Sequence, residues 1–433
     1  GDLKAKPNGQ VPYGAVAGNH DYDVYLSKSS AQQYISYFGP ARYQGRSWFL
    51  GASPNKENMA QLFVANGQMY LHLALEWRPE DKAIAWAQQV LRKHPTVPAI
   101  VATHHYVGTG NPANRSTSGD TADTSGDNSP ESLYRKLVEP FPQVFLVLCG
   151  HVGGNGQLLS TSALGQQVHQ LLVDYQFDTN GGNGFMQLLE FQPGARRLVS
   201  RAFSPTYKAG VTAGTDRAKV AASNYSLSFD HQAHRQFLKS AKIRRFRQGQ
   251  DFGAGAYSGT LDTYIGDGKE GVTKPGVANG AAADVWCDGN QDHEQALIRF
   301  DKIIGGGAGQ VPAGTQIKKA ILTLTTEGSY ADSKGGARFH RMKAAWSESS
   351  TWNSLSGGVT PGAQAETKHD ADSAGKVSSK GTRSFDVTAG VQAWLNGGAN
   401  HGWVMINKST DRWTWRSSEW SEVVERPLLT VLY

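Results

Sequence analysis

Residues 144–151 read Val-Phe-Leu-Val-Leu-Cys-Gly-His, an apolar run that ends in glycine and histidine. A short apolar run bounded by a turn signal is typical of a strand buried on both faces of a sheet. A second run, Val97–Thr103, ends in His104 and His105. A third and shorter run, Val16-Ala17, continues into Gly18-Asn19-His20-Asp21. The sequence therefore predicts three strands that deliver polar side chains at their carboxyl ends.

Helical patterns lie between these runs. Residues 79–93 carry alanine, valine and leucine at helical spacing between an early proline and a closing Arg-Lys pair, and a shorter helix is predicted near residues 130–138. Strands that alternate with helices predict an α/β layered architecture for residues 11–203. In such a sheet the carboxyl ends of the strands line one crevice, so the three polar strand ends can meet although they are far apart in sequence.

The second half of the chain has a different texture. From about residue 253 it is rich in Thr, Gly and Trp and contains alternating stretches such as Ile-Leu-Thr-Leu-Thr at 321–325. This pattern predicts an all-β antiparallel sandwich with one helix near residues 387–395. Six basic residues crowd the stretch before it, which favours a solvated linker. The predicted organisation is a first domain at 1–234, a basic linker at 235–252 and a second domain at 253–433.

Composition narrows the class of protein. Of 433 residues, 39% are hydrophobic and 18% are charged, which suits a folded two-domain protein. The abundance of glycine, with serine, threonine and asparagine, favours a secreted or extracellular location. The net charge of +6 comes with no nucleic-acid motif, so no nucleic-acid partner is predicted. No stretch of 18 apolar residues occurs, so no membrane span is predicted.

The polar strand ends carry a specific resemblance. Gly18-Asn19-His20-Asp21, His104 and Gly150-His151 resemble, in order and spacing, three sequence boxes of calcineurin-like metallophosphoesterases. The resemblance covers roughly residues 1–230. It implies a layered α/β sandwich and a phosphatase or phosphodiesterase activity on a phosphoester substrate.

The resemblance also implies a role for each matching residue. Asn19, His104 and His151 would coordinate one of two divalent transition metal ions, Mn, Fe or Zn. His20 would act as the general acid for the leaving group, and Asp21 would hold His20 in position. Outside this set, Asp174-Tyr175-Gln176 follows another apolar strand and either borders the crevice or is structural.

Two departures from the family pattern bear on activity. The family's two upstream boxes, which supply the bridging Asp and most of the first metal site, are absent from the 17 residues before Gly18, and Gly153 stands where the last box has its second histidine. Three neutral ligands without a carboxylate hold a divalent ion weakly. The sequence therefore predicts one metal ion or none, and little or no turnover, in this chain. Either the missing strands belong to a longer precursor or a separate fragment, or the domain is a relic scaffold.

The second half resembles carbohydrate-binding modules of the DNRLRE type over nearly all of residues 255–433. This resemblance implies a jelly-roll sandwich and a polysaccharide partner, because some such modules are linked with acidic polysaccharides such as alginate. The segments that carry it are 262–265, 296–301, 317–322, 350–353, 385–388, 402–403, 417–419 and 426–431.

Sugar binding needs exposed aromatic rings for the CH-rich sugar faces and cationic side chains for carboxylates or sulfates. Trp413 and Trp415, which alternate beside Arg412 and Arg416, are the best candidates, although any single tryptophan is more often part of a core.

Four oxygen-bearing side chains lie close together in one loop-like segment of the second half. Asp284, Asp288, Asn290 and Asp292 have the hard oxygen ligands that calcium prefers. The alternative is a solvated acidic loop.

Two hypotheses on function follow. The first is a secreted, metal-dependent phosphoester hydrolase that its second domain tethers to polysaccharide. The alternative is a noncatalytic carbohydrate-binding or extracellular matrix protein with a relic phosphoesterase scaffold. Metal content separates the two hypotheses.

Overall fold

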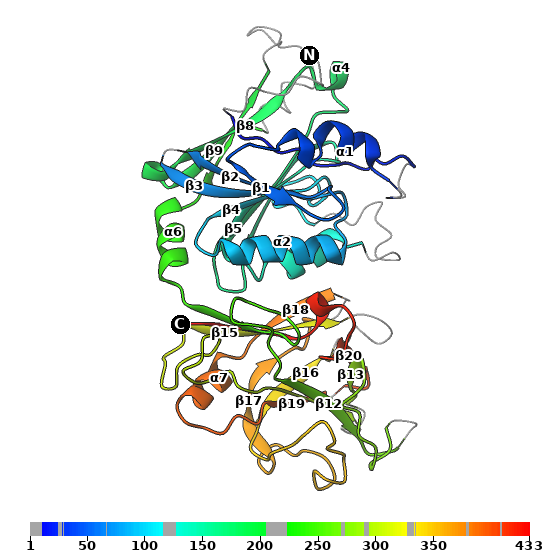
Figure 1. Cartoon of the computed structure of the whole chain (residues 1–433). Helices are drawn as coiled ribbons and strands as arrows, with labels where there is room; N and C mark the ends of the chain where they lie inside the picture. Colours follow the sequence, from blue (N-terminus) through cyan, green and yellow to red (C-terminus); the bar gives the residue numbers. More distant parts are fainter. Residues whose placement is uncertain are drawn as a thin grey trace. The chain divides into compact units, whose positions relative to one another are not determined.

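The computed structural model describes residues 11–24, 28, 30–65, 67–115, 127–204, 223–269, 273–289, 294–326, 333, 335–377, 381–407 and 409–433. The chain divides into two compact units, residues 1–240 and 241–433 (Figure 1). Each unit has buried hydrophobic clusters of its own.

A seven-stranded mixed sheet forms the centre of the first unit, in the order β1-β2-β3-β4-β5-β7-β6 (Figure 1). The four strands β3, β4, β5 and β7 run parallel, and antiparallel neighbours flank them on both sides. The predicted strands at 97–103 and 144–148 are confirmed, as β4 and β5. The strand bounds are β1 Phe49–Ala52, β2 Met59–Ala65, β3 Gln68–Ala74, β4 Ala99–Ala102, β5 Val144–Cys149, β6 Gly154–Thr161 and β7 Gln167–Asp174.

Helices cover one face of this sheet. The helix α2 (Asp81–Lys93) buries Ile84 and Leu91 in one cluster with Leu73 and Val101 of the sheet. The helix predicted at 79–93 is thus confirmed, and it begins two residues later because Glu80 is its N-cap. The shorter predicted helix is confirmed as α3 (Pro130–Leu133), which continues as the π-helix η2 (Tyr134–Val138). The remaining short helices of the unit are α1 Gln32–Phe38, η1 Pro40–Arg42, α4 Thr179–Gly182 and η3 Pro193–Ala195.

A three-stranded antiparallel sheet and the helix α6 (His231–Ser240) lie on the other face. The small sheet has the order β10-β9-β8, with β8 Met186–Gln192, β9 Arg197–Phe203 and β10 Tyr225–Ser228. Phe145 and Leu171 of the large sheet share a buried cluster with Leu198 of the small sheet and with Phe229. The unit is therefore layered as helices, seven-stranded sheet and three-stranded sheet.

The predicted strand at Val16-Ala17 is not present. Residues 12–18 run without strand structure up to the turn at Asn19. They are held by side chains instead: the Tyr34 hydroxyl donates to the Ala15 carbonyl at 2.9 Å, and Gly14 lies so close to His72 and Gln61 that a Cβ there would stand 2.8 Å from the imidazole.

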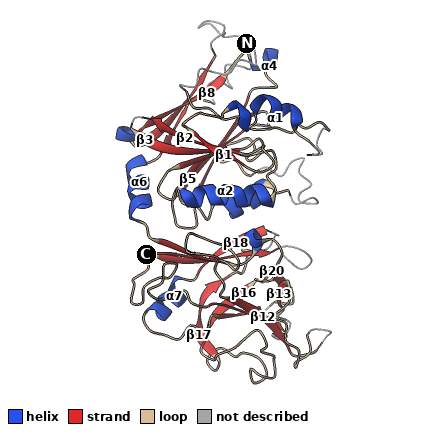
Figure 2. Ribbon diagram, in the orientation of Figure 1, coloured by secondary structure: helices blue, strands red, loops and turns tan. Residues whose placement is uncertain are grey.

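The second unit is a β-sandwich in which strands predominate (Figure 2). One sheet has the order β11-β21-β15-β18, the other has the order β12-β14-β19-β16-β17, and β13 and β20 form a separate ribbon. The bounds are β11 Ile243–Phe246, β12 Thr260–Gly266, β13 Asp284–Cys287, β14 Glu294–Phe300, β15 Lys319–Thr326, β16 Ala337–Met342, β17 Ala365–Asp372, β18 Gly381–Asp386, β19 Trp403–Asn407, β20 Trp413–Arg416 and β21 Leu428–Leu432. The predicted helix is confirmed as α7 (Thr388–Leu395), and one 3-10 turn, η4, spans Val423–Glu425.

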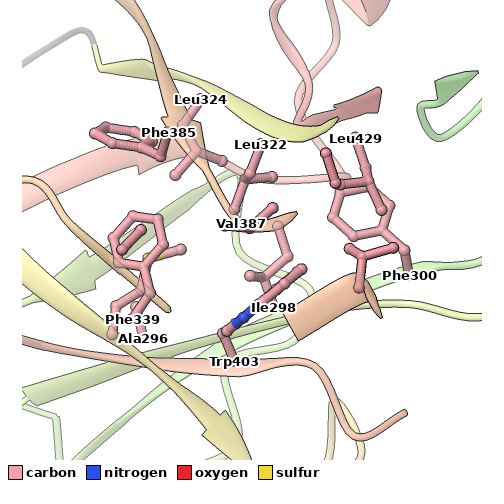
Figure 3. Packing of buried hydrophobic residues seen from close by; sticks show 14 of the residues in the cluster. Ala296, Ile298, Phe300, Leu322, Leu324, Phe339, Phe385, Val387, Trp403 and Leu429 are labelled. Atoms are coloured by element: carbon pink, nitrogen blue, oxygen red, sulfur yellow. The ribbon is translucent and has the colours of Figure 1, made fainter. Parts of the chain in front are cut away.

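Both sheets contribute to the core of the sandwich. Leu322 and Leu429 of the first sheet share one buried cluster with Ile298 and Phe339 of the second (Figure 3). Each such side chain contributes about 1.5–3 kcal/mol by leaving water. On β15, Leu322 and Leu324 belong to this cluster, whereas Thr323 and Thr325, which alternate with them, are buried outside it.

The stretch at 235–252 is ordered structure instead of the predicted linker. Residues 235–240 complete α6, and residues 243–246 form β11, an edge strand paired with β21. Phe246 of β11 is only 2% exposed and belongs to the sandwich core. Arg244 and Arg245 are part of this strand, which pairs with β21 at the edge of the first sheet.

Candidate functional site

Two neighbouring parallel strands position the histidines of the first unit. β4 continues into Thr103 and His104, and β5 continues into Gly150 and His151. The pairing extends past the strand ends, because the Thr103 N–H donates to Leu148 and the Gly150 N–H donates to the His104 carbonyl at 2.9 Å. The two imidazoles are therefore fixed side by side at one edge of the sheet.

Asn19 reaches the same point from the segment before β1. Its Oδ1 lies 2.7 Å from His104 Nε2, and His104 Nε2 lies 3.0 Å from His151 Nδ1. Asn19 is 3% exposed and the two histidines are half-buried. The structure thus brings together the three side chains that the sequence predicted as metal ligands.

The two distances, 2.7 and 3.0 Å, are compatible with ligand atoms around one divalent ion. Ligand atoms about 2.1 Å from a metal ion and at right angles around it lie about 3.0 Å apart. One amide oxygen and two imidazole nitrogens suit Mn, Fe or Zn. Among the described residues no group of three His, Cys, Asp or Glu side chains is placed to hold a metal ion, so this site depends on the amide of Asn19.

The site keeps the His104 imidazole neutral. Burial, followed by the neighbouring His151, His105 and His20, lowers the pKa of His104 to about 4. A neutral imidazole offers the lone pair that a metal ion requires. His151 has a left-handed backbone with φ of 71°, a conformation that is uncommon for residues other than glycine.

The Gly18–Asp21 segment is a closed turn. The Gly18 N–H donates to Asp21 Oδ2 at 2.7 Å, and the Asp21 N–H donates to the Gly18 carbonyl at 3.0 Å. Asp21 therefore fixes the turn that carries Asn19 and the exposed His20. Gly18 leaves room for the His104 ring, because a Cβ at position 18 would stand 3.1 Å from it.

A cleft of about 560 Å³ opens beside His104 and His151. Asp174 and Gln176 line it, which confirms that this segment borders the crevice, and Tyr175 and Phe185 form an aromatic wall with ring centroids 5.8 Å apart. The sequence analysis did not single out Phe185 or Gln187, which also line this cleft. Their only signal is that they follow a glycine-rich turn.

Position 153, where the resembling family has a second histidine, is closed to a side chain. A Cβ on Gly153 would stand 2.5 Å from the ring of Phe177, which is itself 74% exposed. A ligand at this position would require that ring to move.

The predicted sugar platform is buried. Trp413 and Trp415 are 0% exposed and belong to the sandwich core. Arg412 pairs with Glu294 at 3.0 Å, and Arg416 pairs with Asp284 at 2.7 Å. These indoles have no face open to a sugar because β20 turns both of them inward.

Two of the four predicted calcium ligands lie in the described part of the chain, and both contact arginine side chains. Asp284 binds Arg416, and Asp288 lies 3.6 Å from Arg412. Asn290 and Asp292 lie outside the described residues. Both described carboxylates therefore already face a guanidinium group.

A pocket of about 330 Å³ lies on the second unit, between β11 and the loops at 250–258 and 302–310. Three cationic and three aromatic residues line it, together with smaller ones: Arg244, Arg245, Lys302, Phe246, Phe252 and Tyr257. The Tyr257 hydroxyl donates to the Asp301 carbonyl at 2.7 Å, which fixes one ring of the pocket. The sequence analysis missed this pocket because Arg244 and Arg245, two of its three cations, were assigned to a linker.

The second unit is a β-sandwich with a basic pocket. Residues 256–433 match the family model described as carbohydrate-binding module family 96, which supports a carbohydrate-binding module in this part of the chain. β11 lies before the matched range but completes the sandwich.

A curated relative is similar to part of the chain. "Uncharacterized protein YvnB" of Bacillus subtilis (strain 168) is 33% identical over 208 residues, which cover 46% of this chain and 15% of that protein. The chain therefore spans about 15% of the length of that relative. Within the described residues, no helix is both long and apolar enough to cross a membrane.

Proposed function

We propose that the first unit is a metal-dependent phosphoester hydrolase of the calcineurin-like metallophosphoesterase kind, held outside the cell on polysaccharide by the second unit. The observation that carries this proposal is the meeting of Asn19 Oδ1, His104 Nε2 and His151 Nδ1 within 2.7 and 3.0 Å at one sheet edge. The left-handed backbone of His151 and the cleft beside it support the same assignment.

Each residue has a role that follows from its place. Asn19, His104 and His151 would hold the ion, which when bound draws electron density from a phosphoryl oxygen. His20 is exposed at the tip of the Gly18–Asp21 turn, where an imidazole can donate a proton to a leaving oxygen. Tyr175 and Phe185 would contact the organic part of the ester.

Metal binding is the direct test. We expect the chain to bind one equivalent of Mn²⁺ or Zn²⁺, weakly, because all three ligands are neutral. Replacing Asn19 or His151 with alanine should abolish this binding in titration calorimetry. The matched control is His169→Gln, because His169 lies in β7 and its Nε2 donates to the Ser228 carbonyl at 3.1 Å. Equal metal affinity in all variants would contradict the proposal.

A phosphoester hydrolysis assay distinguishes a catalytic first unit from a noncatalytic relic scaffold. The chain is assayed with Mn²⁺ on p-nitrophenyl phosphate and on bis-p-nitrophenyl phosphate. A metal-dependent rate that falls about 100-fold or more in His20→Ala, with metal binding kept, supports catalysis by this chain. Metal binding without turnover would support the noncatalytic alternative for this chain.

We further propose that the second unit binds an acidic polysaccharide in the pocket of Arg244, Arg245 and Lys302. Guanidinium and ammonium groups recognise carboxylates or sulfates, and the Phe252 and Tyr257 rings provide apolar surface for sugar faces.

Affinity electrophoresis tests this site. We expect retention in gels containing a polyuronate and none in gels containing a neutral glucan. Lys302→Gln combined with Arg244→Gln should reduce the retention about tenfold, whereas Lys318→Gln, a change at an exposed lysine outside this pocket, should not. Retention on the neutral glucan, or unchanged retention of the double variant, would contradict the acidic-glycan proposal.

A further inference from the structure

A buried carboxylate in the second unit lacks a counter-ion. Asp262 lies on β12 and is 1% exposed, on the same strand face as Tyr264, which belongs to the sandwich core. Its partner across the sheet is Ile298, also in the core. An ionised carboxylate in such surroundings is unfavourable unless a cation or several hydrogen bonds offset its charge.

The hydrogen bonds to Asp262 are incomplete. Its Oδ2 accepts from the Ser418 N–H at 2.9 Å, but its Oδ1 is buried and has no hydrogen-bond partner among the described residues. Two residues earlier on the same strand face, the Thr260 hydroxyl is also buried without a partner among those residues. Two buried side-chain oxygens without a hydrogen-bond partner in the described part of the chain, Asp262 Oδ1 and Thr260 Oγ1, thus lie on one face of one strand.

More negative charge surrounds this position. The Ser418 hydroxyl donates to Glu419 Oε1 at 2.8 Å, so the Asp262 and Glu419 carboxylates flank one serine. The Glu348 carboxylate accepts from the Asp262 backbone N–H. Burial raises the pKa of Asp262 well above its ordinary value, and Glu419 raises it further. Burial, followed by Glu419, also raises the pKa of Glu348.

Arg299, whose charge opposes the rise in the pKa of Glu348, makes its hydrogen bonds to other partners. Arg299 makes a two-pronged contact with Asp301, at 2.7 and 3.2 Å, and donates to the Trp346 carbonyl at 2.7 Å. The ionised forms of Asp262, Glu348 and Glu419 therefore leave a net negative charge at this end of the sandwich.

We infer that Asp262 and Glu419 form a divalent-cation site of the calcium type in the second unit. Calcium accepts a mixed set of carboxylate, hydroxyl and carbonyl oxygens and completes its shell with water, so two carboxylates and the oxygens beside them suffice. Asp262 is held inside the sandwich, whereas Glu419 is exposed, which gives an ion a path from solvent.

This site brings together segments that the sequence singled out for another reason. Asp262 begins the 262–265 segment, Glu419 ends the 417–419 segment, and Glu348 lies two residues before the 350–353 segment. A cation held by the Asp262 and Glu419 carboxylates accounts for the meeting of two of these segments around Ser418. The site is distinct from the Asp284 and Asp288 carboxylates, which face arginines.

Calcium titration of the full chain tests the inference. We expect chelator-treated protein at pH 7.5 to bind one Ca²⁺ in titration calorimetry and to gain about 5 °C or more in the melting temperature of the second unit. Asp262→Asn should abolish both effects, and Glu419→Gln should weaken binding about tenfold or more. Asp372→Asn, at an aspartate paired with Arg338, and His151→Ala should bind Ca²⁺ like the unchanged chain.

The Asp262→Asn variant has a second readout. Because the amide removes an uncompensated charge, it should be at least as stable as the unchanged chain without calcium, with the same near-ultraviolet circular dichroism. Unchanged calcium binding in Asp262→Asn, or no effect of calcium on the unchanged chain, would overturn the inference. If Asp262 instead holds a proton, calcium has no effect and stability rises as the pH falls, which also overturns it.

Discussion

At Gly156 a single methyl group decides whether the chain after β4 can lie against β6. A Cβ on this residue would stand 2.0 Å from the Gly108 carbonyl oxygen, a backbone atom. Backbone hydrogen bonds from Gly110 to Asn155 and from Gln157 to Gly110 hold the two segments together. Gly156→Ala should therefore lower the free energy of unfolding of the first unit by about 1–3 kcal/mol.

Urea unfolding measures this loss. Gly194→Ala is the control, because no atom lies within 4 Å of a Cβ at position 194, and it should change stability by less than about 0.5 kcal/mol. Equal effects of the two substitutions would show that the contact at Gly156 is unimportant.

The sequence predicts which site residues meet where those residues follow the ends of neighbouring strands. His104 and His151 were predicted to meet because polar residues at the carboxyl ends of neighbouring parallel strands share an edge, and the structure places their rings within hydrogen-bond distance. Asn19 meets His104 as predicted, but it follows a segment without strand structure, so the strand-end argument does not explain its position. The position of Trp413 and Trp415 was not predictable in this way. Their alternation shows that they share a face, but only the packing of β20 shows that the face is the buried one.

The helix α6 should make the first unit sensitive to acid. His234 donates from Nε2 to the Pro142 carbonyl at 2.8 Å, and its Nδ1 is buried with no partner among the described residues. Burial lowers the pKa of His234 to about 4. Because the folded pKa is below the unfolded value near 6.5, stability is full above about pH 6.5 and is lost as the pH falls toward 4.

This histidine should account for a loss on the order of 3 kcal/mol across that window. His234→Gln keeps a donor for Pro142 and should flatten the pH dependence, measured as the urea midpoint between pH 7 and pH 4.5. The control is His401→Gln, at a histidine of the second unit. It should leave the pH dependence of the first unit's urea midpoint unchanged. An unchanged slope in His234→Gln would show that another group titrates.

The edge strand β11 should be part of the second unit's stability. Phe246 is 2% exposed in the core and packs edge-on against Tyr257 at 5.4 Å. Phe246→Ala should destabilise that unit by about 3–5 kcal/mol, followed by tryptophan fluorescence in urea. Val277→Ala, at a side chain that is 45% exposed, should have little effect. A small effect of Phe246→Ala would show that β11 contributes little to the stability of the second unit, as expected of a linker.

Element prediction succeeded where periodicity was strong and failed where composition masked it. The amphipathic pattern of α2 and the apolar runs of β4 and β5 were sufficient. In β11, two arginines precede Phe246 and interrupt the apolar pattern of the strand. The basic composition therefore favoured a linker. Val16-Ala17 was too short a run to distinguish a strand from a segment held by Tyr34.

The whole molecule should behave as two units with separable binding. Each unit has its own core, and the metal site and the basic pocket belong to different units. His151→Ala should therefore lose Mn²⁺ binding and keep its retention on polyuronate, whereas the Arg244 and Lys302 double variant should do the reverse. A variant that loses both properties while folded would show that the two units are coupled.

The location of a bound ion tests the central claim most directly. Crystals of the chain grown with Mn²⁺ or Zn²⁺ should give an anomalous difference peak about 2.0–2.3 Å from Asn19 Oδ1, His104 Nε2 and His151 Nδ1. A well-ordered first unit in which those three atoms are joined by hydrogen bonds and no peak lies between them would contradict the account.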